Sequence, residues 1–518
     1  MAAPSEKLAE SLEVLEELQK NGTVAIRSAA LTRLHRERLV KAGFLQEVMK
    51  GWYIPARPNE PTGESTAWYA CFWDFCAAYL RARFDTNWCL SPEQSLLLHA
   101  GNRTVPEQLM VRSPGARNKV TNFPHGTSLL EVRSSMPQEK DIVEQQGLRL
   151  YALSAALIDS GPRCYQQYPT DARTALAMVR DASDVLERLL DGGHSTIAGR
   201  FAGAFRNIGR GRIADDIVQT MRAADYVVRE EDPFEQAGPA VLGARSVSPY
   251  VNRLHLLWQE MRGPVLERFP AAPGLPGDPE GYLAHVAEEY VNDAYHSLSI
   301  EGYRVSPALI ERVRSGTWNP EDDEDDREHR NAMAARGYWQ AHQAVRESLE
   351  RVLHGENAGL VADDDHGSWY RELFASSVTA GLVRAGDLAG YRSGPVYIRR
   401  SMHVPPRHEA VRDMMPAFFD LLKEEQEAPV RVVLGHFIFV YIHPYMDGNG
   451  RMGRFLMNLM LASGGYPWTI VPLEQRDAYM ATLEQASVGQ DIASFADFLA
   501  GLVETSLAGK ETAIVPRG

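Results

Sequence analysis

Residues 437–465 read FIFVYIHPYMDGNGRMGRFLMNLMLASGG, and this stretch decides the fold of the C-terminal half. Residues 430–442 are apolar on every side, which suits either a buried strand or a buried helix. The run is long for a strand, so we predict a buried helix. Residues 450–463 have the pattern of a second helix, and the two glycines that follow stop it. A short polar loop between two helices therefore carries the chemistry.

The loop and the start of the second helix predict a binding site for an anion. Gly448, Asn449 and Gly450 leave backbone N–H groups free at a helix N-terminus, where the helix dipole is positive. Arg451 and Arg454 are three residues apart on the predicted helix, so their guanidinium groups project in roughly the same direction. Guanidinium groups suit phosphate oxygens. A di- or triphosphate is the expected ligand.

His443 and Asp447 complete the loop. An imidazole takes up a proton near neutral pH, so His443 is a candidate general base. A run of phosphates needs a divalent cation, and Asp447 offers a hard oxygen ligand for Mg²⁺ at the entrance of the loop. The loop therefore predicts a base beside the α-phosphate of a bound nucleotide.

The sequence HPYMDGNGRMGR, residues 443–454, resembles the active-site motif of the Fic family at every defined position. The resemblance covers about 245–518 and implies a compact all-helical Fic domain with a small β-hairpin. It implies an enzyme, a protein adenylyltransferase that moves AMP from ATP to a Ser, Thr or Tyr hydroxyl and releases pyrophosphate. Relatives with another ligand replace the central glycines, so Gly450 favours AMP transfer. Another donor such as UTP, the target protein, self-modification and removal of AMP stay open.

The resemblance also implies a role for each residue of the motif. His443 deprotonates the target hydroxyl, and Asp447 holds Mg²⁺. The amides of residues 448–450 bind the phosphates of ATP. Arg451 assists, and Arg454 holds the γ-phosphate.

Two further stretches fit this resemblance. Val396, Tyr397 and Ile398 alternate in polarity and resemble the flap that pairs with an extended segment of the target, so we expect a short exposed hairpin. An ordinary surface hairpin is the alternative. Arg476 and Tyr479 resemble residues that border the pocket for the nucleotide base.

A helix over about 281–301 is predicted to inhibit the site. Its apolar residues recur at helical spacing from Leu283 to Leu298, and Ser297 and Glu301 lie at the edge of that inward stripe. An inward carboxylate is costly unless a cation meets it, and Arg454 is such a cation. The sequence SLSIEG also resembles the inhibitory motif of the Fic family, in which the glutamate pairs with the second arginine. A helix-ending glutamate in solvent is the alternative.

The N-terminal residues 1–58 resemble a winged helix-turn-helix. A helix is predicted over 7–19, followed by a helix pair and two short strands, FLQEV and WYIPA. Residues 23–57 carry seven Lys or Arg against two Glu. This excess predicts contact with DNA phosphates, while many winged helices bind protein instead.

Residues 59–240 mix helices and strands and, together with the winged helix, resemble the abortive-infection antitoxin family of transcriptional regulators. Prolines and glycines in 231–249 predict a domain boundary near 240. The expected domains are thus 1–58, 59–240 and a Fic domain over 245–518, in a mainly α fold. The acidic run EDDEDD at 321–326 is expected on a solvated loop without a function.

The composition is that of a soluble globular protein, with 44% hydrophobic and 24% charged residues. The net charge of −14 argues against a protein that coats nucleic acid over its whole surface. We find no export signal and no apolar run that would span a membrane, so we expect a cytoplasmic protein without a membrane partner. A homodimer stays open. The alternative function is a DNA-binding regulator whose Fic domain senses a nucleotide; it would need the phosphate cradle but not His443.

Overall fold

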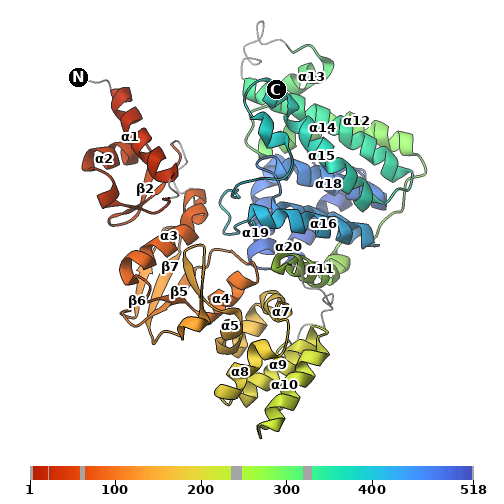
Figure 1. Cartoon of the computed structure of the whole chain (residues 1–518). Helices are drawn as coiled ribbons and strands as arrows, with labels where there is room; N and C mark the ends of the chain where they lie inside the picture. The colour runs from red at the N-terminus through yellow and green to blue at the C-terminus, as the bar shows by residue number, and fades with distance from the viewer. Residues whose placement is uncertain (1–3, 21–22, 59–64, 235–247, 319–328, 516–518) are drawn as a thin grey trace. The chain divides into compact units, whose positions relative to one another are not determined.

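The computed structural model describes residues 4–20, 23–58, 65–234, 248–318 and 329–515 (Figure 1). The chain divides into two compact units, which are described separately below. The N-terminal unit comprises Met1–Arg253 and Tyr397–Val404, and the C-terminal unit comprises Leu254–Val396 and Pro405–Gly518. The division falls within helix α11, Pro249–Arg268. The described residues are mainly helical, as predicted.

The N-terminal unit begins with two helices and a small antiparallel sheet of order β1-β3-β2. The two strands predicted from FLQEV and WYIPA are present, and Gly51, with φ 83°, makes the turn between them. The side chain of Thr32 caps helix α2 by accepting a hydrogen bond from the backbone N–H of His35. These elements are α1 Pro4–Lys20, β1 Ile26–Arg27, α2 Arg33–Lys41, β2 Leu45–Met49 and β3 Trp52–Pro55.

The rest of this unit mixes sheets and helices, as predicted for the stretch from 59 to 240. One sheet has the order β4-β5-β7-β6, with β5 and β7 parallel, and β8 pairs with β9 in a hairpin. The strands are β4 Cys89–Leu90, β5 Gln108–Ser113, β6 Lys119–Asn122, β7 Ser128–Arg133, β8 Ile142–Gln145 and β9 Leu148–Tyr151. The helices are α3 Thr66–Phe84, α4 Pro92–His99, α5 Leu153–Asp159, α6 Pro162–Gln167, α7 Pro169–Ala177, α8 Ser183–Asp191, α9 Ser195–Asn207 and α10 Gly211–Ala223.

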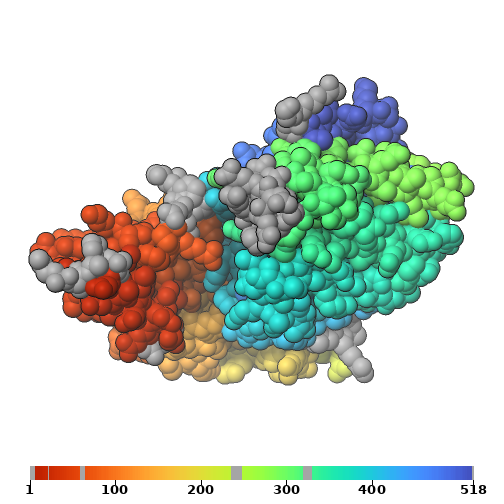
Figure 2. All heavy atoms as spheres, turned by 90° about the horizontal axis from the view of Figure 1, so that it is seen from above, coloured from red at the N-terminus to blue at the C-terminus, as the bar shows by residue number. Residues whose placement is uncertain are grey.

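The C-terminal unit is a bundle of helices in its described part. Helices α14 and α15 pack against each other, as do α17 and α18, and α14 also contacts α12 and α18 (Figure 1). In the space-filling view, the green to blue atoms of this unit form one continuous surface on the face shown (Figure 2). The helices are α12 Pro279–Ile300, α13 Pro307–Ser315, α14 His329–Leu353, α15 Ala358–Thr379, α16 His408–Glu424, α17 Ala428–Ile442, α18 Asn449–Gly464, α19 Arg476–Val488 and α20 Ala493–Leu507.

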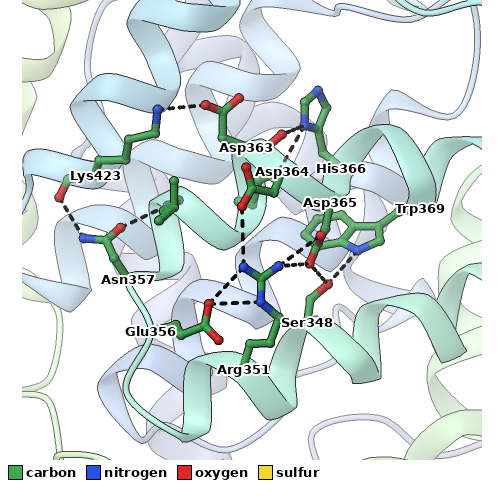
Figure 3. Close-up of polar contacts among 12 residues, drawn as sticks. Ser348, Arg351, Glu356, Asn357, Asp363, Asp364, Asp365, His366, Trp369 and Lys423 are labelled. Carbon is green, nitrogen blue, oxygen red and sulfur yellow. Dashed lines mark hydrogen bonds and ion pairs between the residues drawn. The ribbon is translucent and has the colours of Figure 1, made fainter.

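A polar network fixes the turn between α14 and α15 (Figure 3). Arg351 donates hydrogen bonds to Glu356, Asp364 and Asp365. Ser348 donates a hydrogen bond of 2.7 Å to Asp365 and accepts one of 3.0 Å from the indole of Trp369. Arg351 thus offsets the charge of three carboxylates. The network stabilises the packing of α14 against α15, two helices that carry part of the site.

The predicted flap hairpin is wrong in its secondary structure. No strand forms anywhere in residues 391–407, and Tyr397–Val404 packs with the N-terminal unit. Within that unit, the Val105 N–H donates 2.9 Å to the carbonyl of Met402, and the Arg400 N–H donates 3.0 Å to the Thr66 hydroxyl. The backbone of the segment therefore bonds to other segments of its unit, and its internal bond from the Ser401 N–H to the Ile398 carbonyl closes a turn rather than a hairpin ladder.

Several predictions concern residues that the structure describes only in part. The acidic run at 321–326 lies outside the described residues, and so does most of the predicted linker, since 235–247 are not described. The boundaries at 58 and 240 stay predictions. Within the described ranges, no helix is long and apolar enough to cross a membrane.

Candidate active site

The site lies where α17 ends and α18 begins. Every residue of α17 except Arg431 is buried, which confirms the buried helix predicted for the apolar run. The helix ends at His443, whose φ of 53° and ψ of 61° turn the chain into the loop. Gly448, with φ 80°, starts α18, and Gly465, with φ 77°, ends it. The loop at 443–448 thus runs between two packed helices.

The imidazole of His443 is fixed by its own helix. Its Nδ1 lies 3.1 Å from the carbonyl oxygen of Val440, and a carbonyl can only accept, so Nδ1 carries the proton. Burial lowers the pKa of His443 to about 4, and the charge of Arg392 lowers it further, against the hydrogen bond to Val440, which raises it. The ring is therefore neutral at pH 7, with the lone pair of Nε2 available to take a proton.

The N-terminus of α18 has the free backbone N–H groups on which the predicted anion cradle depends. The Met452 N–H bonds to the carbonyl of Gly448, so the N–H groups of the preceding helical residues have no partner within the helix. Asn449 contributes its backbone only. Its side-chain amide is buried and exchanges two hydrogen bonds of 2.9 Å with the backbone of Tyr445, which braces the loop.

The carboxylate of Glu301 lies against this cradle. Its Oε1 is 2.8 Å from Nη2 of Arg454, and a Cβ built on Gly450 would clash with the same oxygen. Ser297 binds the other side of Arg454: its hydroxyl accepts a hydrogen bond of 2.9 Å from Nε, and its carbonyl accepts one of 3.0 Å from Nη2. The structure therefore brings Ser297 and Glu301 against Arg454, which is 157 and 153 residues away from them in the sequence.

The charges around Glu301 keep it ionised. Burial would raise its pKa, but the positive charges of Arg454 and Arg451 and the hydrogen bond from Arg454 outweigh burial and lower it. The Arg454 side chain is 4% exposed, while that of Glu301 is 31% exposed. Arg454 is thus a buried cation with one replaceable, partly exposed anion.

Arg451 lies between two aromatic rings. Its guanidinium carbon is 5.2 Å from the ring centroid of Tyr303 and 5.0 Å from that of Phe374. Tyr303 follows Glu301 by two residues, so the end of the α12 region contacts both arginines of the motif. The sequence analysis did not single out Tyr303; the signal was an aromatic residue next to the SLSIEG motif.

Asp447 could contribute to a cation site. Its side chain is 67% exposed and lies 3.7 Å from Arg451, and its Oδ1 accepts the Gly448 N–H at 2.6 Å. In the described part of the chain, no group of three His, Cys, Asp or Glu residues could hold a metal ion by itself. A single exposed carboxylate suits Mg²⁺, which takes its other ligands from phosphates and water.

A buried polar chain lies behind Arg454. The hydroxyl of Tyr338 donates a hydrogen bond of 2.7 Å to Asp293 and is also hydrogen-bonded to Ser297. Burial raises the pKa of Asp293 to about 6, against the Tyr338 hydrogen bond and the charge of Arg454, which lower it. Arg454 therefore connects to a second carboxylate through Ser297 and Tyr338.

The two residues predicted to border a base pocket lie close to Glu301 and Arg454, and their role in a pocket stays a prediction. Tyr479 is 2% exposed; its hydroxyl is 2.7 Å from Nε2 of His436 and is also hydrogen-bonded to Arg454. Arg476 donates a hydrogen bond of 2.8 Å from Nε to the carbonyl of Ile300, the last residue of α12. That contact holds the end of the helix that carries Glu301.

Of the predicted flap residues, Val396 is buried and Tyr397 is exposed, and only Val396 belongs to the C-terminal unit. Arg392, just before the segment, was not predicted. It is 2% exposed and donates a hydrogen bond of 2.8 Å to the carbonyl of His443. No local pattern in the sequence indicates this contact.

Known proteins resemble the C-terminal half. Residues 365–461 match the Fic/DOC family, a range that includes the loop but neither Glu301 nor Tyr479. Protein adenylyltransferase Fic of Nematostella vectensis is 28% identical over 54% of this chain and 62% of its own length. The protein of the same name from Drosophila willistoni is 31% identical over 42% of this chain and 41% of its own length. The chain thus spans less than two thirds of these curated relatives.

A solved structure, Fic-1 (residues 134–508) from C. elegans, covers 69% of this chain and 86% of its own. It is 19% identical, with a TM-score of 0.37.

Proposed function

We propose that this chain is a protein adenylyltransferase, which transfers AMP from ATP to a Ser, Thr or Tyr hydroxyl of a target protein and is inhibited by Glu301. One observation carries the proposal: a neutral imidazole with a free Nε2 adjoins a helix N-terminus whose arginine already holds a carboxylate. The similarity to proteins named protein adenylyltransferase Fic supports it.

The chemistry follows from the loop. Nε2 of His443 takes the proton of the target hydroxyl, and the oxygen attacks the α-phosphorus of ATP. A P–O bond forms to the target, the bond between the α-phosphorus and the bridging oxygen breaks, and pyrophosphate leaves. The amides of residues 448–450 and the two arginines stabilise the negative charge that develops on the phosphates.

Asp447 is the residue that would hold Mg²⁺ together with oxygens of ATP. The ion, when bound, would offset phosphate charge and favour departure of pyrophosphate. Asp447 also braces the loop through the Gly448 N–H, so one carboxylate serves both the cation and the turn.

Inhibition follows from competition for Arg454. The Glu301 carboxylate is an anion beside the first turn of α18, where phosphate oxygens of ATP would bind. When Glu301 holds Arg454, the γ-phosphate lacks its cation, and the α-phosphorus is not presented to His443. The resting enzyme is therefore largely inactive.

Transfer of the correct group is the decisive test. The Glu301→Gly variant is incubated with ATP labelled either at the α- or at the γ-phosphate. Label from the α-position and a mass gain of one AMP group on protein are expected, and His443→Ala in the same background abolishes both. Label from the γ-position would show a kinase instead, and no label in lysate with any nucleotide would refute the proposal.

DNA binding by residues 23–57 is a second candidate function. The sheet order β1-β3-β2, with α2 preceding the β2–β3 ribbon, supports the winged helix proposed for residues 1–58. The side chains of Arg36 and Arg38, however, donate to the carbonyls of Ser28 and Lys7, which fixes them within the fold.

The other five basic residues of this stretch are exposed and are thus left as the expected phosphate contacts: Arg27, Arg33, Lys41, Lys50 and Arg57. We expect the Lys41→Glu/Lys50→Glu variant to lose binding to a random duplex in fluorescence anisotropy, while Lys119→Glu on β6 binds as the wild type does. Wild-type protein that does not bind at low salt would contradict this role.

A further inference from the structure

One buried guanidinium group joins the backbone of the candidate base to a neighbouring segment. Nε of Arg392 donates 2.8 Å to the carbonyl of His443, and Nη2 donates 3.4 Å to that of Ile442. The backbone N–H of Arg392 donates 2.9 Å to the carbonyl of Pro444. A single residue therefore binds three successive carbonyl groups, from the last residue of α17 to the second residue of the loop.

The same guanidinium group holds both ends of the segment between residues 394 and 406. Nη1 donates 3.1 Å to the carbonyl of Gly394, and Nη2 donates to the carbonyl of Pro406. Hydrogen bonds from a charged donor are stronger than neutral ones, and a buried guanidinium that lost them would carry a large desolvation cost. The two ends of the segment are thus tied to the loop of His443.

The backbone of His443 needs such support. Its φ of 53° is unusual for a residue with a side chain, and the following Pro444 favours an extended conformation at 443 instead. Conformations of this kind are strained and persist only where the surroundings enforce them. Arg392 donates hydrogen bonds to the carbonyl of Ile442, before His443, and to the carbonyl of His443 itself. These two bonds restrain the backbone dihedral angles of His443.

We propose that Arg392 is a positioning residue, which holds the left-handed backbone of His443 and both ends of the 394–406 segment in one hydrogen-bonded unit. This inference rests on the proposed function for its catalytic meaning. By restraining the backbone of His443, Arg392 fixes the direction in which the imidazole projects, and it acts on the reaction through His443.

The test compares Arg392→Lys with Arg431→Lys. Lysine keeps the charge but cannot reach four carbonyl groups at once. Arg431 is a matched control because it donates to the carbonyls of Glu425 and Gln426 at the other end of α17. Hydrogen exchange of the peptide covering 440–448 and the pKa of the His443 imidazole by NMR are measured without nucleotide, so the result does not depend on whether the protein transfers AMP.

In Arg392→Lys we expect exchange at 440–448 to be at least about tenfold faster, the effect of losing one hydrogen bond to a charged group. The pKa of His443 should move from about 4 toward the ordinary 6.5, because the ring gains access to water next to Glu301 and Asp447. Arg431→Lys should change neither. Wild-type values in Arg392→Lys, or equal changes in both variants, would overturn the proposal.

Should Arg392→Lys fail to fold, the wild-type protein provides the measurement. A single hydrogen-bonded unit predicts that the N–H groups of Arg392 and His443 exchange through the same opening, with equal dependence on denaturant. Distinct openings at the two positions would show that Arg392 does not hold the loop.

Discussion

Three features of the structure suit His443 to the proposed role of general base. The Val440 carbonyl keeps the proton on Nδ1, and burial keeps the ring neutral. At the turn that ends α17, the contact with Val440 is made by Nδ1 and not by Nε2. A histidine in water would be partly protonated below pH 7. Here the proton acceptor is present over a wider range of pH.

The pH dependence of transfer follows from this pKa. His443 must be neutral to act, and its folded pKa of about 4 lies below the ordinary 6.5, so activity is retained down to about pH 5 and falls as pH drops through 4. The initial rate of the Glu301→Gly variant between pH 4 and 8 measures this, with circular dichroism as a control for unfolding. An acidic limb near 6.5 would contradict the neutral imidazole with a lowered pKa.

Ser297 should contribute to inhibition through Arg454. Ser297→Ala removes the hydroxyl that accepts from Nε but leaves the carbonyl and Glu301 in place. One hydrogen bond to a charged group is worth about 1.5–3 kcal/mol at most. We expect a rise in basal transfer that is smaller than that of Glu301→Gly, measured in one labelling assay. Ser299→Ala, on the same helix, should behave as the wild type does.

Residue-level prediction worked where local chemistry dictates the outcome. The inward position of Glu301 required a cation, and Arg454 is the cation it meets. The pocket role of Tyr479 stays a prediction; its bond to the buried His436, 43 residues away, could not be read from the sequence. Arg392 was missed because its partners are backbone carbonyl groups, which leave no trace in the sequence.

At the scale of elements, the end of α12 controls where Glu301 lies. Glu301 is the C-cap residue of α12, and the stretch around η5, Leu473–Gln475, fastens this end at two points. The Leu473 N–H donates 3.0 Å to Nδ1 of His296, and Arg476 donates to Ile300. The position of the Glu301 carboxylate, proposed to inhibit the site, thus depends on a helix end that a distant segment holds.

Loosening that end should activate the enzyme. Arg476→Met removes the hydrogen bond to Ile300 while keeping a long side chain, so basal transfer is expected to rise by up to about tenfold. A residue that bordered a nucleotide pocket would give a fall instead, which makes the sign of the change decisive. Arg314→Met, on α13 with an exposed partner in Glu311, is the control and should leave the rate unchanged.

The flap shows the limit of pattern-based prediction at this scale. Alternation of Val396, Tyr397 and Ile398 predicts a strand. A strand forms only when a second strand pairs with it, and alternation does not show which segment that would be. The segment instead bonds to residues of the N-terminal unit through single hydrogen bonds. Helices were predicted well because their hydrogen bonds are internal.

At the scale of the whole molecule, two buried histidines are expected to make the C-terminal unit less stable at low pH. Burial, and after it a nearby arginine charge, lowers the pKa of His342 to about 3, and burial lowers that of His436 to about 4. An unfolded chain would protonate both near 6.5, so their contribution to stability is present above 6.5 and is lost as pH falls toward 4.

His342→Phe should reduce this sensitivity to acid. His342 is fully buried, and within the described structure neither of its ring nitrogens has a hydrogen-bond partner. Phenylalanine keeps ring contacts with Tyr290 and Trp468 and removes an unsatisfied polar group, worth about 1–3 kcal/mol. We expect a higher Tm and a flatter decline between pH 6.5 and 4 in thermal melts.

His436→Phe is the control for that substitution, since it costs the Tyr479 hydroxyl its hydrogen bond. It should lower the Tm. A lower Tm in both variants would show that His342 has a polar role.

Which residues form which of the two units was only partly predictable from the sequence. A helical C-terminal half and a mixed N-terminal half followed from hydrophobic spacing, and both are present. That Tyr397–Val404 packs with the N-terminal unit did not follow, because packing between segments far apart in the chain depends on shape and burial rather than on local periodicity.

The central claim is that the Glu301 carboxylate occupies the place of a phosphate at Arg454. The most direct test is the rate of AMP transfer in the wild type and in Glu301→Gly, compared at saturating ATP. Loss of a charge-assisted contact predicts a rate about ten- to a hundredfold higher in the variant. Equal rates in the two proteins would contradict the account.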